Sequence, residues 1–225
     1  GSKMIITIDG PVNSGKSTIA RMLAQKRGLF YINSGLLFRA LAYVLTEICK
    51  IPLEQLVTLT HDQILKCFDL SRLEYMYQGN SESVLYDRNN ISWHLKSQAI
   101  DHAASLIATN GDVREILLKL ERSLAQLHDV VIDGRDTGSV VFPHADYKFF
   151  LTAAPEIRAK RWQRSQEKKG NRLPLDIALK EVNRRDERDK TRLVAPLIEP
   201  ADAINIDSSD KSMDEVVKVI EGFLS

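Results

Sequence analysis

Residues 4–17 read MIITIDGPVNSGKS, and this stretch decides the fold. Its first part, 4–9, is a short apolar run that predicts a buried parallel strand. Its second part, 10–17, fits the pattern GxxxxGK[ST], and a helical pattern follows over about 15–27. A strand, a glycine-containing loop and a helix in this order are the setting in which the pattern binds phosphate.

A loop of this kind holds phosphate through its backbone, because its N–H groups and the positive end of the helix dipole point at the anion. We expect Lys16 to neutralise charge between the β- and γ-phosphates of ATP, and the Ser17 hydroxyl to bind Mg²⁺. Asn13 suits the loop because Asn tolerates left-handed backbone angles. The predicted nucleotide-binding residues are Gly10, Pro11, Val12, Asn13, Ser14, Gly15, Lys16, Ser17 and Thr18.

The composition is that of an ordinary globular protein. The chain has 225 residues, 44% of them hydrophobic and 27% charged, which suits one domain. Lys and Arg number 31 against 30 Asp and Glu, so the net charge is +1. This balance argues against a protein built to coat nucleic acid. No apolar run approaches the roughly 20 residues of a membrane span.

The cysteines and histidines predict neither a disulfide framework nor a zinc site. Cys49 and Cys67 are the only cysteines, and no CxxC or HExxH pattern occurs. We therefore expect two reduced, partly buried thiols and a cytoplasmic location. We find no signal peptide, and we interpret Gly1-Ser2 as the remnant of a cleaved tag.

The rest of the chain alternates between strand and helix patterns. Further strands are predicted over 130–133, 147–151 and 203–206. Further helices are predicted over 34–44, 53–68, 93–108, 113–127, 157–168, 175–190 and 213–223. Residues 72–77 and 83–87 alternate apolar and polar side chains across Gly79-Asn80, which predicts an antiparallel hairpin. Strands separated by helices indicate an α/β fold with a doubly wound parallel sheet, into which the hairpin is inserted.

Arginines recur where such a sheet meets its ligand. Arg135 and Asp136 follow the predicted strand 130–133, and open α/β sheets bind ligands at the carboxyl ends of their strands. Arg39 lies on the second predicted helix. Two later helices carry further arginines on one face each, namely Arg158 and Arg161, and then Arg185, Arg188 and Arg192. A solvated surface with salt bridges is an equally good interpretation of those two helices.

Many arginines without an activated Ser, His or Cys favour phosphoryl transfer between two phosphates. A nucleoside monophosphate has its second pKa at about 6, so it is largely dianionic at neutral pH and needs no general base. Arginine and Mg²⁺ offset the repulsion between the two polyanions. The residues therefore predict a nucleotide kinase. Open alternatives are a kinase of another small acceptor, such as shikimate, and a slow ATP-hydrolysing switch, whereas RNA binding is disfavoured.

The chain resembles the cytidylate kinase family along nearly its whole length. The matching segments are IDGPVNSGKST, INSGLLFRALA, VVIDGRDTGSVVFPHADYKFFLTA, RRDERDKTRLVAPL and ADAINIDSS. The resemblance implies a P-loop NTPase-type sheet with an antiparallel monophosphate-binding insert and a helical lid. It implies in-line phosphorylation of CMP and dCMP by ATP with Mg²⁺, in a monomer that binds neither nucleic acid nor membrane.

The resemblance also implies roles for single residues. Ser34 lies near the sugar of the acceptor, and Arg39 binds its phosphate. The positions that recognise cytosine are Ser105, Arg114 and Asp136. The other substrate-binding positions are Arg135, Arg185, Asp189 and Arg192. Three positions depart from the family's pattern: Asn13, Trp93 and Lys96.

The implied division of the chain has a core of 4–50, 109–155 and 195–225, an insert of about 51–108 and a lid of about 156–194. The groups implied in phosphoryl transfer are Lys16, Arg135, Arg158, Arg161 and Arg192. Ser17 is the expected Mg²⁺ ligand. Asp133 is either its partner through water or a structural residue at a strand end.

Overall fold

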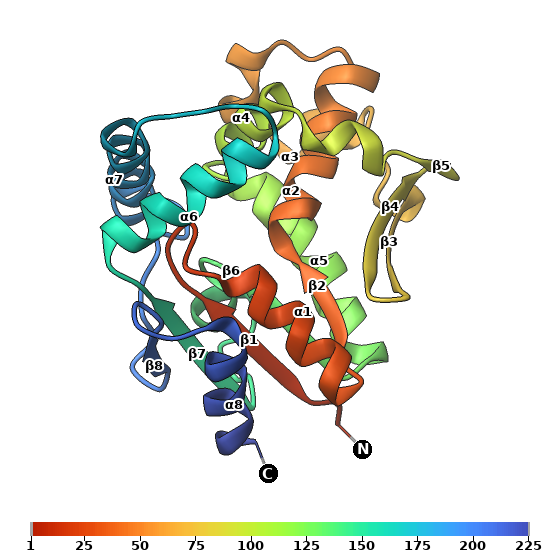
Figure 1. Cartoon of the computed structure of the whole chain (residues 1–225). Coiled ribbons are helices and arrows are strands. Elements are labelled where there is room, and N and C mark those ends of the chain that lie inside the picture. The colour runs from red at the N-terminus through yellow and green to blue at the C-terminus, as the bar shows by residue number, and fades with distance from the viewer. Residues whose placement is uncertain (1, 225) are drawn as a thin grey trace. The chain divides into compact units, whose positions relative to one another are not determined.

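The computed structural model describes residues 2–224, which form two units (Figure 1). The first unit comprises 2–4 and Phe30–Val130, and the second comprises Ile5–Leu29 and 131–224. The chain therefore leaves the first unit after three described residues and returns to it for the 101 residues from Phe30 to Val130. Each unit is described by itself below.

The second unit contains parallel strands in the order β6 (Val130–Gly134), β1 (Ile5–Asp9), β7 (Tyr147–Thr152) and β8 (Ile204–Asp207). β1 pairs in parallel with β7, with Ile6 opposite Tyr147, and β7 pairs in parallel with β8. Ile6, Ile8 and Leu151 are completely buried. A parallel sheet with continuous apolar strands is what the short runs in the sequence predict, so the α/β class is confirmed.

Four helices accompany these strands: α1 (Lys16–Arg27), α6 (Pro155–Lys168), α7 (Leu175–Thr191) and, after β8, α8 (Met213–Phe223). α1 contacts α8, and α6 packs along α7 through Ala159, Ala178 and Val182. The helices predicted over these stretches are confirmed to within two residues at each end. Among residues 2–224, no helix has the length and apolar character needed to cross a membrane.

The first unit begins with β2 (Phe30–Asn33) and α2 (Ser34–Tyr43), which continues into a π-helical turn, η1 (Val44–Ile48). Two short helices, η2 (Leu53–Thr58) and α3 (His61–Leu65), precede the turn η3 (Leu70–Arg72). An antiparallel sheet of β3 (Leu73–Gln78), β4 (Ser81–Tyr86) and β5 (Asn89–Asn90) follows. The unit ends with η4 (Ser92–Lys96), α4 (Gln98–Ile107) and α5 (Gly111–Leu127).

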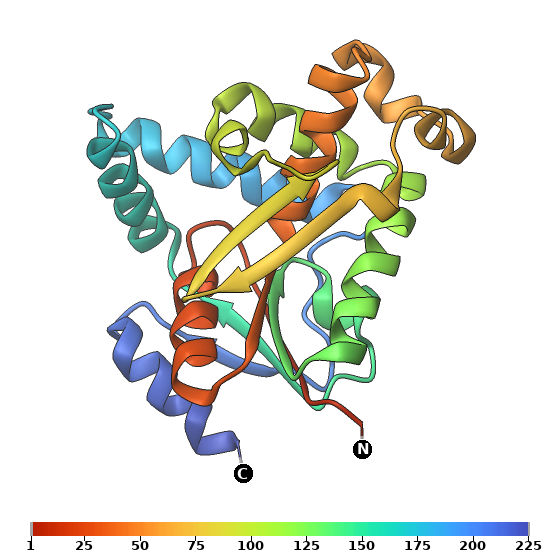
Figure 2. The ribbon, with the colours of Figure 1, turned by 90° about the vertical axis from the view of Figure 1, so that its right-hand side faces the viewer.

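The predicted hairpin is confirmed, and Figure 2 shows its two long strands. Gln78 pairs with Ser81, so Gly79 and Asn80 form a two-residue turn with φ of 58° and 59°. Positive φ at both central residues gives the turn whose twist matches that of the strands, and Gly and Asn tolerate it best.

The structure differs from the predicted elements in three places. β2 was not predicted, although Phe30, Tyr31 and Ile32 are good strand formers, because the run is only four residues long and leads straight into α2. The helix predicted over 53–68 is the two short helices η2 and α3. The helix predicted over 93–108 is broken at Ser97, whose hydroxyl accepts from the Ile100 N–H (3.2 Å) and starts α4 anew.

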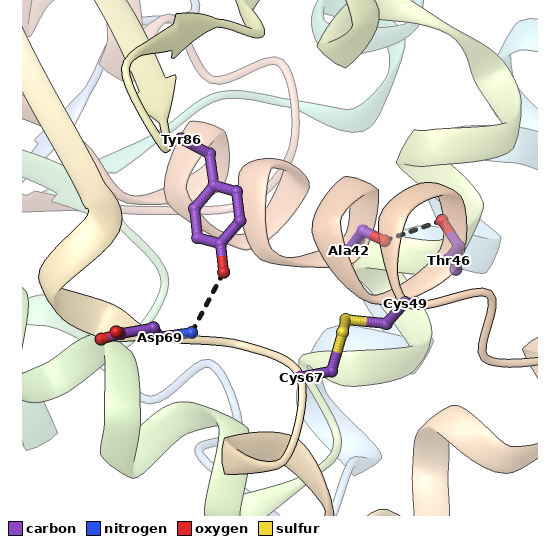
Figure 3. The surroundings of a disulfide bond; sticks show 6 residues. All are labelled: Ala42, Thr46, Cys49, Cys67, Asp69 and Tyr86. Atoms are coloured by element: carbon purple, nitrogen blue, oxygen red, sulfur yellow. Dashed lines mark hydrogen bonds between the residues drawn. A yellow bond between two sulfur atoms is a disulfide. The ribbon is translucent and has the colours of Figure 1, made fainter.

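The prediction of two reduced thiols is wrong for this structure. Cys49 and Cys67 form a disulfide within the first unit, with Cα atoms 5.9 Å apart (Figure 3). Cys49 is half-buried, whereas Cys67 is exposed rather than partly buried. The pairing depends on the end of η1 meeting the loop after α3, which sequence spacing alone does not reveal.

Candidate active site

The loop between β1 and α1 has the backbone of a tight anion-binding turn. Gly15 has a φ of 95° and Asn13 a φ of 58°, both in the left-handed region. A Cβ at Gly10 would overlap the Leu151 carbonyl oxygen of β7. The glycines and Asn13 are therefore required by the path of the chain at these positions.

Lys16 begins α1 and is buried, with only 8% of its surface exposed. Its ammonium donates to the Pro11 carbonyl oxygen (3.2 Å). Burial, followed by the positive charge of Arg135, lowers the pKa of Lys16 from 10.5 to about 8, and Asp133 and Asp189 offset part of this. Two like charges held close together without a bound anion are a strong indication that the site binds one.

Two polar atoms of the loop also lack partners. The Ser14 hydroxyl and the Asn13 side-chain nitrogen are buried, and neither makes a hydrogen bond with any described residue. Buried polar groups are nearly always paired, so orphaned ones in a loop of this type fit the oxygen atoms of an absent phosphate. This observation supports the predicted nucleotide-binding residues from the structure's own geometry.

Ser17 and Asp133 lie together at the start of α1. The Ser17 hydroxyl donates to the Asp133 carboxylate (3.0 Å), and Asp133 is buried at the end of β6. One hydroxyl and one carboxylate, completed by phosphate oxygens and water, fit the way proteins hold Mg²⁺. No cluster of three or more His, Cys, Asp or Glu side chains that could bind a metal occurs in the described chain.

The segment after β6 positions Arg135 and Asp136. Arg135 donates through Nε to the buried Asp189 carboxylate of α7 (2.6 Å). Asp9, at the end of β1, accepts from the Thr137 N–H and hydroxyl and from the Gly138 N–H (2.6–2.9 Å). Burial raises the pKa of the Asp9 carboxyl, although these hydrogen bonds act against that rise. Asp9 was not predicted as the anchor of this segment, since a polar residue at the end of a strand carries no further signal.

Arg158, predicted to act in phosphoryl transfer, is held by hydrogen bonds to α7 and to the phosphate-binding loop in this structure. Its guanidinium is buried and bonds both oxygens of Asp186 on α7 (2.8 and 2.7 Å). It also donates to the carbonyl oxygens of Ala153 (2.8 Å) and Val12 (3.3 Å). Arg158 and Arg161 lie three residues apart on α6, and both donate to carbonyl oxygens of the phosphate-binding loop. The buried partner Asp186 was not predicted.

Arg161 contacts the loop directly. It donates to the Ser14 carbonyl oxygen (3.1 Å) and to the hydroxyl and carbonyl oxygens of Ser208 (3.3 and 3.2 Å). Burial, and next the charge of Arg158, lower the pKa of Arg161. Positive charge is thus concentrated on this side of the loop as well.

Two further predicted arginines of the second unit have hydrogen-bond acceptors on or just after α7. Arg185 donates to Glu181 (2.9 Å) and lies 5.8 Å from the centre of the Trp162 ring. Arg192 donates through Nε to the Ala195 carbonyl oxygen (2.7 Å). Asp189, predicted as a substrate-binding residue, is in contact with Arg135, and its other carboxylate oxygen lies 4.0 Å from the Arg188 Nε.

In the first unit, α2 carries two of the predicted acceptor residues. Ser34 is buried, and its hydroxyl donates to Glu121 of α5 (2.7 Å), a buried carboxylate that was not predicted. Arg39 is half-buried, and its Nε makes no hydrogen bond with any described residue. A buried guanidinium N–H without an acceptor is suited to an anionic ligand.

The predicted base-reading residues of this unit lie on α4 and α5. The Ser105 hydroxyl donates to the His102 carbonyl oxygen (2.7 Å). Arg114 donates to the Ala108 carbonyl oxygen (3.0 Å) and lies over the Phe38 ring at 5.0 Å. Of the positions that depart from the family's pattern, Trp93 is 83% exposed and lies 5.8 Å from the Lys96 ammonium.

Comparison with known proteins identifies the family. A model of the cytidylate kinase family matches residues 6–223. The cytidylate kinase of Desulforamulus reducens is 37% identical over 215 residues, which cover 96% of this chain and 94% of that protein. The cytidylate kinase of Geobacillus sp. is 38% identical, over 94% and 92% of the two chains. That of Pseudomonas entomophila is 36% identical, over 98% and 95%.

Proposed function

The chain belongs to the cytidylate kinase family, and from this premise we propose that it transfers the γ-phosphoryl group of ATP directly to CMP and dCMP, releasing ADP and CDP or dCDP. The observation that carries the proposal is the concentration of positive charge around an orphaned phosphate-binding loop. Lys16 and Arg135 are close enough for one charge to lower the pKa of the other group. A bound polyanion would compensate the positive charge that the neighbouring carboxylates leave.

On the donor side, we place the ATP phosphates in the loop of residues 10–18. The Ser14 hydroxyl and the Asn13 side-chain amide supply donors that are already buried and unpaired. Ser17 and Asp133 would hold Mg²⁺, which spreads the negative charge of the bound phosphates. Arg161 and Arg158 hold the loop's carbonyl oxygens, so its N–H groups stay turned to the ligand.

On the acceptor side, the monophosphate is already a dianion and attacks without a general base. We assign its phosphate to Arg39, whose Nε has no partner, together with Arg135 and Arg192. Ser34, Arg185 and Asp189 are assigned to the sugar, and Ser105, Arg114 and Asp136 to the base. Cytosine offers an amino donor and ring acceptors, which match a carboxylate and an arginine.

Water must be kept from the γ-phosphate, because it would compete as the acceptor. We assign this role to residues 156–194 acting as a lid, and acceptor binding to residues 51–108, with the rest of the chain as the core. We also propose that the enzyme is a cytoplasmic monomer that binds neither nucleic acid nor membranes.

A coupled assay of ADP release tests this function against its alternatives. We expect turnover with CMP and dCMP, and almost none with UMP, shikimate or no acceptor. Turnover with shikimate alone would identify a different small-molecule kinase. A rate of ADP release that is the same with every acceptor and with none would identify a nucleotide-hydrolysing switch.

Asp136→Ala should remove most of the preference for CMP over UMP. Uracil presents a carbonyl where cytosine has its amino group, and a carboxylate facing that oxygen is left unpaired, which gives large discrimination. We expect the ratio of kcat/KM for CMP to that for UMP to fall by about a hundredfold. Asp136→Asn is the matched control, because its amide donates to uracil and should move the preference further towards UMP. An unchanged ratio in both variants would refute the assignment.

ATP binding should take up a proton at alkaline pH. The pKa of Lys16 is about 8 in the free protein, and bound phosphates raise it again. Uptake should therefore grow from about a quarter of a proton at pH 7.5 to about nine tenths at pH 9, and affinity should fall as the pH rises through this range. Calorimetry in two buffers of different ionisation enthalpy measures the uptake. Equal uptake at both pH values would contradict the argument.

A further inference from the structure

The disulfide of the first unit ties a helix end to a loop. Cys49 follows η1, where its N–H donates to the Val44 carbonyl oxygen (2.8 Å). Cys67 follows α3, and its N–H donates to the Ile64 carbonyl oxygen (3.2 Å). Figure 3 shows the sulfur–sulfur bond crossing from the end of the helix to the loop. Two stretches that no backbone hydrogen bond of the described chain joins directly are thereby linked.

The segment that the disulfide closes, 50–66, has little regular structure of its own. It consists of η2 and α3, which are six and five residues long. Helices this short are not stable alone. Leu56 is buried, and the Asn110 side chain donates to the Leu56 and Leu59 carbonyl oxygens (3.1 and 2.9 Å). A covalent tie that closes such a segment restricts it strongly.

The two ends of the disulfide lead to different parts of the acceptor-binding machinery. Cys49 lies at the far end of the helix that begins at Ser34 and carries Arg39. Beyond Cys67, Phe68 is fully buried and stacks on Tyr86 of β4 with ring centres 5.7 Å apart. The Tyr86 hydroxyl accepts from the Asp69 N–H (3.1 Å; Figure 3). The bond therefore connects α2 to the hairpin.

We propose that Cys49–Cys67 is a redox modification site at which a small dithiol exchanges, and that its oxidised state fixes the first unit in a form that binds the acceptor nucleotide more tightly. The effect on the acceptor rests on the function proposed above. Cys67 is exposed whereas Cys49 is half-buried, so the Cys67 sulfur is the one that a reductant reaches. Disulfides in reducing compartments are typically of this exchangeable type.

The exchange is balanced by the dithiol alone. One of its thiolates attacks the Cys67 sulfur, forms a mixed disulfide and displaces Cys49 as a thiolate. The second thiolate then attacks the reductant's own sulfur in the mixed disulfide, which closes a cyclic disulfide and releases Cys67. Two electrons pass to the protein, and its two thiolates take up the two protons that the dithiol loses.

The test compares the oxidised enzyme with the same enzyme reduced by dithiothreitol. Reduction should expose two titratable thiols, speed amide hydrogen exchange over 44–69 and raise KM for CMP by about threefold to tenfold, because a fixed site binds with less loss of freedom. KM for ATP should change less than about twofold. The double variant Cys49→Ser, Cys67→Ser should show the raised KM for CMP of the reduced enzyme, and dithiothreitol should not change it.

Two results would decide against the proposal. Two titratable thiols in the oxidised preparation would show that the bond does not form. Faster exchange with an unchanged KM for CMP would make the disulfide purely structural. If the enzyme phosphorylates neither CMP nor dCMP, the proposed function fails by itself, and the Kd for CMP in the two states, measured by calorimetry, then tests the disulfide without turnover.

Discussion

Lys16→Met should lower kcat for CMP phosphorylation by about a thousandfold or more. In the proposed function this buried ammonium stabilises the phosphoryl group in the transition state, and methionine keeps most of the side chain's length without the charge. The measurement is the initial rate of ADP release at saturating ATP and CMP. A variant that keeps near-normal turnover would exclude the loop from phosphoryl transfer.

The same variant should be more stable than the wild type at pH 7. The folded protein holds the proton of Lys16 less tightly than the unfolded chain, since its pKa falls from 10.5 to about 8, so the charged form disfavours folding at every pH below about 8. Removing the charge should raise Tm by about several degrees. Lys26→Met is the matched control on the same helix. Lys26 is exposed, and its ion pair with Glu221 (3.7 Å) is of the exposed kind that contributes little to stability. It should change neither turnover nor Tm appreciably.

The parts of the fold that sequence predicts are those set by local pattern. The buried runs of β1, β6 and β7 are recognisable because a parallel strand is apolar on both faces. The Gly79-Asn80 turn is recognisable because few residues tolerate positive φ. α8 was predicted with its bounds, and in the structure the Ser212 side chain caps its start by accepting from the Glu215 N–H.

The features that sequence did not predict are set by contacts distant along the chain. The disulfide requires that η1 and the loop after α3 meet, which neither segment encodes alone. Arg158 was expected to act in phosphoryl transfer, because the resemblance implies it, and its spacing with Arg161 shows only that the two share a face. Its burial against Asp186 and the Val12 carbonyl oxygen depends on how α6, α7 and the loop pack.

Arg135→Met should lower kcat by about a thousandfold and raise the pKa of Lys16. Asp189 holds the Arg135 Nε at 2.6 Å, which orients the guanidinium while its charge acts on Lys16. An arginine that stabilises the transferring phosphoryl group accounts for about 10³-fold or more in kcat. With that charge gone, the pKa of Lys16 should rise above about 8, because a like charge no longer opposes its protonation. Carbon NMR of the lysine Cε titrates the group directly.

Asp189→Asn should shift the pKa of Lys16 in the opposite direction in the same NMR titration. It removes a carboxylate that favours the charged form of Lys16, so the pKa of Lys16 should fall below about 8. Arg135 keeps its charge in this variant but loses its ionic partner, so kcat should fall less than in Arg135→Met. A general disturbance of the fold would move both pKa values the same way. Opposite shifts require that Lys16, Arg135 and Asp189 form one electrostatic cluster, which is the arrangement that two phosphates need in order to meet.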